Sequence, residues 1–308
     1  MLTFLKRLKR HRKSTFRPVI VVTGAGSGIG LAIAELLYSD IRYRVVITAR
    51  AKSLPALRDV FPDDDRFWVR ELDVTNDEHR RELIREISEK WDGVNILVNN
   101  AGISYRAVLE HMSEDNEHHQ MDTNYFGPVA LIRLVLPYMR FLGRGKIINV
   151  SSVSGMLAMP TMASYSASKY ALEGVSEALW YEMKPMGINV SLIQPGFVHS
   201  NSFMNVYYTE ASKPVPGEHG AYSDYYENMI PFVEKLMRMS LTNPEDIAKR
   251  VLKVIKTENP PLWVPATLDA TIFYYVRRLV PRRFLLPLLF LSLPGARRWG
   301  KGYSKRRE

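Results

Sequence analysis

The chain has 308 residues, 46% of them hydrophobic and 24% charged, a composition that excludes a disordered or fibrous protein. It contains no cysteine, which excludes disulfides, a thiolate nucleophile and a cysteine-ligated metal. The net charge of +10 lies at the ends, because residues 1–17 carry seven bases and no acid and residues 277–308 carry ten bases against Glu308. The stretch between them holds 25 basic and 31 acidic residues, so we expect no nucleic-acid partner.

Short runs rich in Val and Ile alternate with helix-like segments from residue 18 onward. Nearly continuous apolar runs are typical of strands buried on both faces, and their alternation with helices predicts a parallel, doubly wound α/β sheet of Rossmann type. The predicted strands are Val19–Thr23, Arg44–Thr48, Trp68–Leu72, Ile96–Asn99, Lys146–Val150, Asn189–Ile193 and a shorter Leu262–Val264.

The last third of this region breaks the alternation. Residues 199–240 are rich in Tyr, Met, Gly and Pro, and so long an irregular insert predicts a substrate lid. A helix is predicted to start directly afterwards, with Thr242 as its cap, Pro244 in its first turn and Glu245 completing a capping box.

A glycine-rich turn joins the first predicted strand to the first predicted helix. Its pattern is G-x-x-x-G-x-G from Gly24 through Gly28 to Gly30, and it is not G-x-G-x-x-G because Ile29 takes the place of the third glycine. Free N–H groups at the start of a helix bind a pyrophosphate well. The second strand is followed by Arg50 and not by an acid, which favours a 2′-phosphate and therefore NADP(H) over NAD(H).

Four motifs in order and spacing resemble the short-chain dehydrogenase/reductase family. They are TGAGSGIG, NNAG at Asn99–Gly102, YxxxK at Tyr165–Lys169 and the pair Pro195–Gly196. The resemblance covers residues 18–257. Within it, the segment from Gly155 to Gly196 is similar to the branch of the family that converts steroids and retinol. The family resemblance implies a seven-stranded sheet in the order 3-2-1-4-5-6-7 in one domain, and a homodimer or homotetramer.

The predicted catalytic residues are Asn124, Ser152, Tyr165 and Lys169. Tyr165 and Lys169 are four residues apart and share a helix face, where the ammonium favours the phenolate that accepts a proton from an alcohol. The resemblance assigns Ser152 to the substrate oxygen, Lys169 also to the nicotinamide ribose, and Asn124 to a proton relay.

The predicted cofactor contacts combine the glycine turn, Arg50 and positions that the resemblance assigns. Ser200 stands where many relatives have threonine and keeps the hydroxyl. The full set is Gly24, Ser27, Gly28, Ile29, Gly30, Arg50, Asp73, Val74, Asn99, Ala101, Gly102, Tyr165, Lys169, Val198 and Ser200.

Two histidine patterns are interpreted conservatively. His118 and His119 follow two glutamates, but the spacing is not H-E-x-x-H, so we expect a solvated helix and no metal site. His199 lies beside the predicted cofactor pocket without a visible carboxylate partner, and it is left out of the catalytic set.

Methionines and aromatic residues surround the expected substrate pocket. This composition suits a bulky lipophilic ligand, and the alternative is that these side chains only pack the lid onto the body. The residues are Met156, Met159, Met162, Phe203, Met204, Tyr207 and Tyr208.

The two ends form separate segments around a catalytic domain at residues 18–265. Residues 1–17 and 266–308 are basic, and Phe284–Leu293 is apolar but too short to span a bilayer. Such segments suit the interface of an anionic membrane, with the alternative that the C-terminal run caps the core or an oligomer contact. We therefore expect a cytoplasmic protein, peripheral on the cytoplasmic face of a membrane.

These observations predict an NADP(H)-dependent oxidoreductase of lipid metabolism. It would interconvert a lipophilic alcohol and its carbonyl compound (steroid-, retinoid- or long-chain-type) by hydride transfer, with Tyr165 as the acid or base. One alternative is a 3-oxoacyl thioester reductase acting on a carrier protein. The other is a cofactor-binding scaffold at a membrane without turnover.

Overall fold

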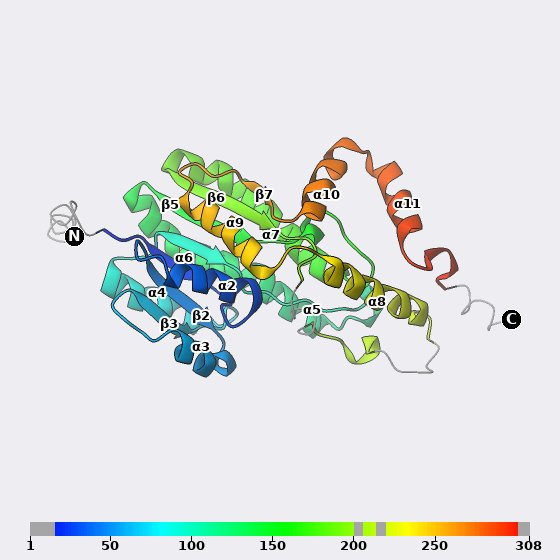
Figure 1. The fold of residues 1–308 in the computed structure, drawn as a ribbon, viewed down its shortest axis with the longest axis horizontal. Coiled ribbons are helices and arrows are strands. Elements are labelled where there is room, and N and C mark those ends of the chain that lie inside the picture. The colour runs from blue at the N-terminus through cyan, green and yellow to red at the C-terminus, as the bar shows by residue number, and fades with distance from the viewer. Residues whose placement is uncertain (1–15, 200–205, 214–219, 301–308) are drawn as a thin grey trace.

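Seven parallel strands form the centre of the molecule in the computed structural model, which describes residues 16–199, 206–213 and 220–300 (Figure 1). Their order is β3-β2-β1-β4-β5-β6-β7, which confirms the predicted sheet. Each predicted strand is present within about one residue of its expected bounds. The strands are β1 (Val19–Val22), β2 (Arg44–Ala49), β3 (Phe67–Glu71), β4 (Ile96–Asn99), β5 (Gly145–Val150), β6 (Ile188–Gln194) and β7 (Trp263–Pro265).

Helices cover both faces of the sheet because alternate strand residues point to opposite sides. In β1, Ile20 and Val22 pack with α2, α3 and α9, whereas Val19 and Val21 pack with α4, α6 and α7. The helices of the first layer are α2 (Gly28–Tyr38), α3 (Leu54–Val60) and α9 (Pro244–Lys256). Those of the second layer are α4 (Asp77–Trp91), α6 (Gly127–Leu142) and α7 (Ala163–Met183).

The chain leaves β1 for β2 on one side and later returns to β4 on the other. Parallel sheets bind ligands where the strand order reverses, in the crevice beyond the carboxyl ends of the strands. The crevice is closed at its base by a hydrogen bond from the Thr23 backbone N–H to the Val98 carbonyl, 3.0 Å between N and O. The topology therefore places the glycine turn, the ends of β4 and β5 and the start of α7 around one site.

The start of α9 differs from the prediction. Asn243, not Thr242, is the N-cap, and its side chain accepts from the backbone N–H of Asp246. The box is completed by the Asp246 carboxylate, which accepts from the Asn243 N–H, and not by Glu245. Pro244 occupies the first turn as predicted. The prediction was one residue early because Thr242 and Asn243 are both good caps, and packing of α9 against α2 selects the register.

Residues 199–240 contain more regular structure than predicted. Helix α8 runs from Ser223 to Met239, with Pro231 inside it, and α10 (Leu268–Leu279) and α11 (Arg282–Ser292) follow β7. Figure 1 shows α8, α10 and α11 beyond one end of the sheet, with α10 starting next to β7. Residues 1–15 of the predicted basic N-terminal segment (residues 1–17) lie outside the described part of the chain.

Helix α5 (Glu114–Met121), a π-helical turn (Asp122–Phe126) and α6 form one continuous helical segment. In the part of the chain that the structure describes, this is the one helix long and apolar enough to cross a membrane. However, α6 buries Leu131, Val135 and Met139 against the sheet. We therefore assign the segment to the protein core.

Candidate active site

A cavity of about 430 Å³ extends along the carboxyl ends of the strands. One end is formed by the glycine turn and the residues after β2 and β3, and the other by the residues after β5 and the start of α7. Segments far apart in the sequence thus form one continuous wall. Both ends carry polar groups, and this asymmetric cavity is the candidate active site.

The glycine turn brings backbone close to the cavity. Gly24 has φ of +69°, and a Cβ there would lie 2.7 Å from the Cα of Ala101. Gly28 has φ of +56° and open space where a Cβ would be. The side chain of Ser27, the N-cap of α2, makes no capping hydrogen bond, so the first N–H groups of the helix remain available to a ligand. This arrangement fits a pyrophosphate.

Arg50 and Asp73 line the cavity near the glycine turn, after β2 and β3. The Arg50 guanidinium donates to the Tyr207 hydroxyl at 3.4 Å, a contact that brings the segment before α8 to this end of the cavity. Burial raises the pKa of Asp73, but hydrogen bonds from the side chain and backbone of Thr75 and the Arg50 charge outweigh it and lower the pKa overall. A phosphate entering here would meet a cation held beside an ionised carboxylate.

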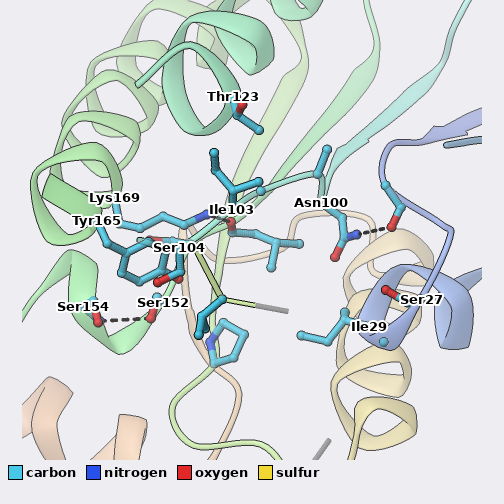
Figure 2. Close-up of a pocket in the computed structure, with 18 of the residues that line it drawn as sticks. Ser27, Ile29, Asn100, Ile103, Ser104, Thr123, Ser152, Ser154, Tyr165 and Lys169 are labelled. Atoms are coloured by element: carbon cyan, nitrogen blue, oxygen red, sulfur yellow. Dashed lines mark hydrogen bonds between the residues drawn. The ribbon is translucent and has the colours of Figure 1, made fainter. Parts of the chain in front are cut away.

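Asn99 and Asn100 separate at the end of β4 because consecutive strand residues point to opposite sides. Asn99 is buried behind the wall and donates to Asn149 Oδ1 at 2.9 Å. Asn100 lines the cavity, and its Nδ2 donates to the carbonyls of Thr23 and Gly24 at 3.0 and 3.1 Å. Figure 2 shows this link to the turn. Asn99 therefore supports the wall, and Asn100, which was not predicted, forms it.

Tyr165 and Lys169 extend from α7 into the cavity, and Ser152 reaches the same place from the end of β5 (Figure 2). The Lys169 Nζ lies 5.9 Å from the centre of the Tyr165 ring and donates to the Val150 carbonyl at 2.9 Å. Ser152 accepts from the Ser154 N–H at 3.1 Å, which fixes its hydroxyl beside the tyrosine. The three predicted side chains are thus assembled by tertiary structure.

Burial sets the protonation of this trio. It raises the pKa of Tyr165, while a hydrogen bond with Ser152 and the charge of Arg106 oppose the rise. Burial also lowers the pKa of Lys169 to about 8, against the attraction of the Glu173 carboxylate. Without a bound cation beside it, Tyr165 is therefore a phenol at neutral pH, whereas Lys169 still carries its proton on most molecules.

Glu173 lies one helical turn beyond Lys169 and is buried. Its Oε1 accepts from Ser151 at 2.7 Å and from Gln194 at 2.9 Å. Burial raises the pKa of this carboxyl, and both hydrogen bonds and the Lys169 charge oppose the rise. Glu173 thus forms the back of the lysine site and ties α7 to the ends of β5 and β6.

Asn124 sits in the π-helical turn between α5 and α6, a kind of distortion that often accompanies functional sites. Its side chain accepts from the Ile103 N–H and donates to the Ile103 carbonyl, both at 2.9 Å, and it also donates to Ser168. A Cβ on Gly102 would lie 3.2 Å from Asn124 Oδ1 and 3.6 Å from Lys169 Nζ. The amide is therefore next to the lysine, behind the cavity wall.

Most predicted cofactor contacts line the cavity. They are Gly24, Ser27, Gly28, Ile29, Arg50, Asp73, Val74, Ala101, Gly102, Tyr165, Lys169 and Val198. Gly30 lies behind the turn, where a Cβ would meet the Gly24 carbonyl. Ser200 lies outside the described residues.

The far end of the cavity is more apolar than the glycine turn. Met159 and Met162 line it as predicted, together with Val206 and with Val233 and Met237 of α8. Met156 does not, because it packs with Val153 and Ala270 under α10. Tyr207 stacks near Tyr105, 5.2 Å between ring centres. Phe203 and Met204 lie outside the described residues.

Two further wall residues were missed. His119 lines the cavity and contacts the Tyr105 hydroxyl at 3.1 Å, so the solvated interpretation holds for His118 and is wrong for His119. Arg106 lines the cavity as well, and its Nε and Nη1 atoms are fully buried. The only available signal for Arg106 was its place a few residues after NNAG. His199 is exposed at the surface, where its Nδ1 lies 3.2 Å from the Arg238 carbonyl oxygen.

Comparison with known proteins identifies the family to which this chain belongs. The model of the family described as short chain dehydrogenase matches residues 18–211. The chain belongs to the short-chain dehydrogenase/reductase family. This confirms the resemblance seen in the sequence, and the family's members are oxidoreductases.

Two relatives within the short-chain dehydrogenases/reductases are named for their substrates. The chain is 36% identical over 245 residues to a 3-ketodihydrosphingosine reductase of Bacteroides thetaiotaomicron, which covers 79% of the chain and 85% of that protein. It is 32% identical over 249 residues to retinol dehydrogenase 8 of Bos taurus, with 79% of each covered.

Solved structures of the family share the fold. A short-chain dehydrogenase from Streptomyces avermitilis aligns with a TM-score of 0.74 at 31% identity, covering 90% of this chain and 98% of that one. A metagenomic short-chain oxidoreductase in complex with NADP aligns with a TM-score of 0.61 at 26% identity, covering 80% and 96%. Together with the glycine turn, the NADP complex of the second structure supports a nicotinamide cofactor.

Proposed function

We propose that the protein is an NADP(H)-dependent oxidoreductase that interconverts a lipophilic alcohol and its carbonyl compound. The observation that carries the proposal is one cavity with Arg50 and the glycine turn at one end and Tyr165, Ser152 and Lys169 at the other. The apolar far end and the names of the two relatives support a lipophilic substrate.

The protein's own residues supply binding, orientation and proton transfer. The N–H groups at the start of α2 hold the pyrophosphate, and Arg50 pairs with the 2′-phosphate. The bound nicotinamide supplies or accepts the hydride. Ala101, Gly102, Ile103 and Val198 line the same cavity as Tyr165 and would hold the nicotinamide end of the cofactor.

Tyr165 performs the proton step. In reduction its phenol donates to the developing alkoxide, and in oxidation its phenolate accepts the alcohol proton. Ser152 donates a hydrogen bond to the same oxygen and stabilises its charge. Lys169 keeps a positive charge near the phenol, and Asn124, which lies on the same side of Gly102 as the Lys169 amino group, would take part in a proton relay through the lysine.

The test follows NADPH and NADH absorbance with the purified full chain. The carbonyl panel contains a retinoid, a steroid, a long-chain aldehyde, a 3-keto sphingoid base and a carrier-bound 3-oxoacyl thioester. We expect turnover of one lipophilic class, faster with NADPH. Tyr165→Phe should lower kcat by about 10²–10⁴-fold and leave NADPH binding intact, because it removes only the transferable proton.

Two outcomes would contradict the proposal. Activity on the carrier-bound thioester alone would identify a thioester reductase of lipid synthesis. Tight NADPH binding without turnover of any carbonyl would indicate a scaffold. The matched control is Tyr170→Phe, on an exposed position of the same helix, which should not change kcat.

A further inference from the structure

Helix α10 has an apolar surface that nothing in the described structure covers. Its outward residues recur at intervals of four, three and four, which places them on one helical face. They are Leu268, Ile272, Tyr275 and Leu279, and each is between 52 and 77% exposed. Large exposed apolar patches on a folded protein mark interaction sites.

Helix α11 extends this surface. Its residues are almost all exposed, and Leu285 is the one buried side chain of the helix. The outward apolar side chains, each at least 47% exposed, are Phe284, Leu286, Leu288, Phe290 and Leu291. We call the outward faces of α10 and α11 the C-terminal apolar surface.

Arginines border this surface. Arg282 and Arg283 begin α11, and Arg297 and Arg298 follow it, all exposed. None of the four forms an ion pair with a described residue. The one acid between residues 266 and 300 is Asp269, which is turned inward and accepts from the Phe197 N–H at 2.9 Å. Within residues 266–300, every other charged side chain is therefore positive.

From these features we infer that α10 and α11 dock the enzyme on an anionic lipid surface. A bilayer interface offers apolar chains below negative headgroups, which matches both the apolar side chains and their arginine border. A second copy fits less well, because a symmetric contact through this face would bring the same arginines together. A 12-residue helix is about 18 Å long, too short to cross the hydrocarbon layer, so the helices lie on the surface.

The inner side of α10 packs behind the active-site wall. Thr267 Oγ1 accepts from the Gly196 N–H at 2.9 Å, and Arg277 Nε donates to the Met156 carbonyl at 2.5 Å. Gly196 and Phe197 both line the cavity. Docking through the outward face of α10 would thus place lipid on one side of the helix and the back of the cavity wall on the other.

Helix α11 is held to the other flank of the cavity. Trp299, just after it, stacks on Tyr225 of α8 with ring centres 4.6 Å apart, and Gly295 packs against Asn228. The same helix α8 contributes Val233 and Met237 to the apolar end of the cavity. Docking would place this end next to the membrane, where a lipophilic substrate is dissolved. This part of the inference rests on the proposed function.

The experiment is flotation of the purified full chain with vesicles of phosphatidylcholine, with and without phosphatidylglycerol. We expect binding to the anionic vesicles that weakens as salt is raised. Ile272→Glu/Leu279→Glu and Arg282→Glu/Arg283→Glu should each weaken binding at least about tenfold. The matched control, Arg58→Glu/Val60→Glu on α3, introduces the same residue types at exposed positions and should bind like wild type.

Every variant is first checked by circular dichroism and urea denaturation, which show that it is folded without requiring turnover. Absence of wild-type binding, or equal binding of all variants, would overturn the inference. So would equal binding to neutral vesicles, or a dimer that the Ile272→Glu/Leu279→Glu variant abolishes without any vesicle binding. Binding of an acidic carrier protein to this surface, without any binding of vesicles, would overturn it as well.

Flotation requires no turnover, so the two proposals fail separately. Vesicle binding without activity on any carbonyl would contradict the proposed function and leave the docking surface standing. Turnover of soluble and vesicle-bound carbonyls by a chain that does not float would contradict the docking surface alone.

Discussion

Arg106 is a side chain that enters the candidate active site from a segment far from Tyr165 in the sequence. Its backbone N–H donates to the Tyr207 carbonyl at 2.8 Å, and the next residue donates to the Thr161 carbonyl at 2.9 Å, which pins the segment on both sides. Its guanidinium is buried in the cavity wall, and its charge opposes the rise that burial causes in the pKa of Tyr165. We therefore expect Arg106 to act as a positioning residue that favours the phenolate.

Arg106→Met is expected to change the pH dependence of turnover. Without the cation the pKa of Tyr165 rises. Alcohol oxidation needs the phenolate, so its rate should reach half-maximum at a higher pH, and the decline of carbonyl reduction at alkaline pH should move the same way. Initial rates across pH test this in both directions. Arg106→Lys keeps the charge and should restore much of the wild-type pH profile. If Arg106 had a purely structural role, Arg106→Met would lower the rate without shifting the pH profile.

At the scale of single elements, the short α9 depends on its first turn. Asn243 and Asp246 exchange hydrogen bonds between side chain and backbone, 2.9 Å from the Asp246 N–H and 3.2 Å from the Asn243 N–H. The helix then buries Ile247, Val251 and Val254 against α2 and the sheet. A weak cap would release this packing from one end.

Asn243→Ala is expected to lower the free energy of unfolding by about 1 kcal/mol, because an N–H at the helix start loses its acceptor. Thr242→Ala is the matched control and should have a much smaller effect, since Thr242 does not cap the helix. Urea denaturation followed by circular dichroism measures both. Equal losses in the two variants would show that the cap contributes nothing specific.

Some helices and strands are determined by their own local sequence, and others depend on packing against distant segments. Most of the parallel strands are buried and are read directly from short runs rich in Val and Ile. The aromatic β3 and the short, partly exposed β7 carry a weaker form of this signal. Helix α8 was not predicted, because Pro231 and the surrounding Tyr and Met residues disguise its period, and its stability comes from packing Tyr226, Met229 and Val233 inward. Its boundary depends on contacts that a local pattern does not contain.

The whole molecule couples cofactor binding to stability, because the cavity joins segments from β1 to α8. A ligand that binds only the folded chain at 100 times its Kd raises the free energy of unfolding by about 2.7 kcal/mol. Arg50→Ala should reduce this increment for NADPH at a fixed concentration and leave the increment for NADH unchanged. Urea denaturation with each cofactor measures it, and an equal NADPH increment in both proteins would contradict the assignment of Arg50 to the 2′-phosphate.

The strands, the glycine turn and the tyrosine–lysine pair were accessible from local patterns, whereas the strand order, Ser152 and Asn124 came from the family resemblance. Strands buried on both faces, a turn that requires glycine, and a tyrosine and lysine one helical turn apart are all short-range constraints. Tertiary structure alone decided what depends on direction and distant packing. Consecutive residues of a strand point to opposite sides, which puts Asn100 and not Asn99 in the cavity wall. Arg106, His119 and the residues of α8 join the site because segments remote in sequence fold over it. The exposed faces of α10 and α11 exist because only one side of each helix finds a partner, and no local pattern states which side that is.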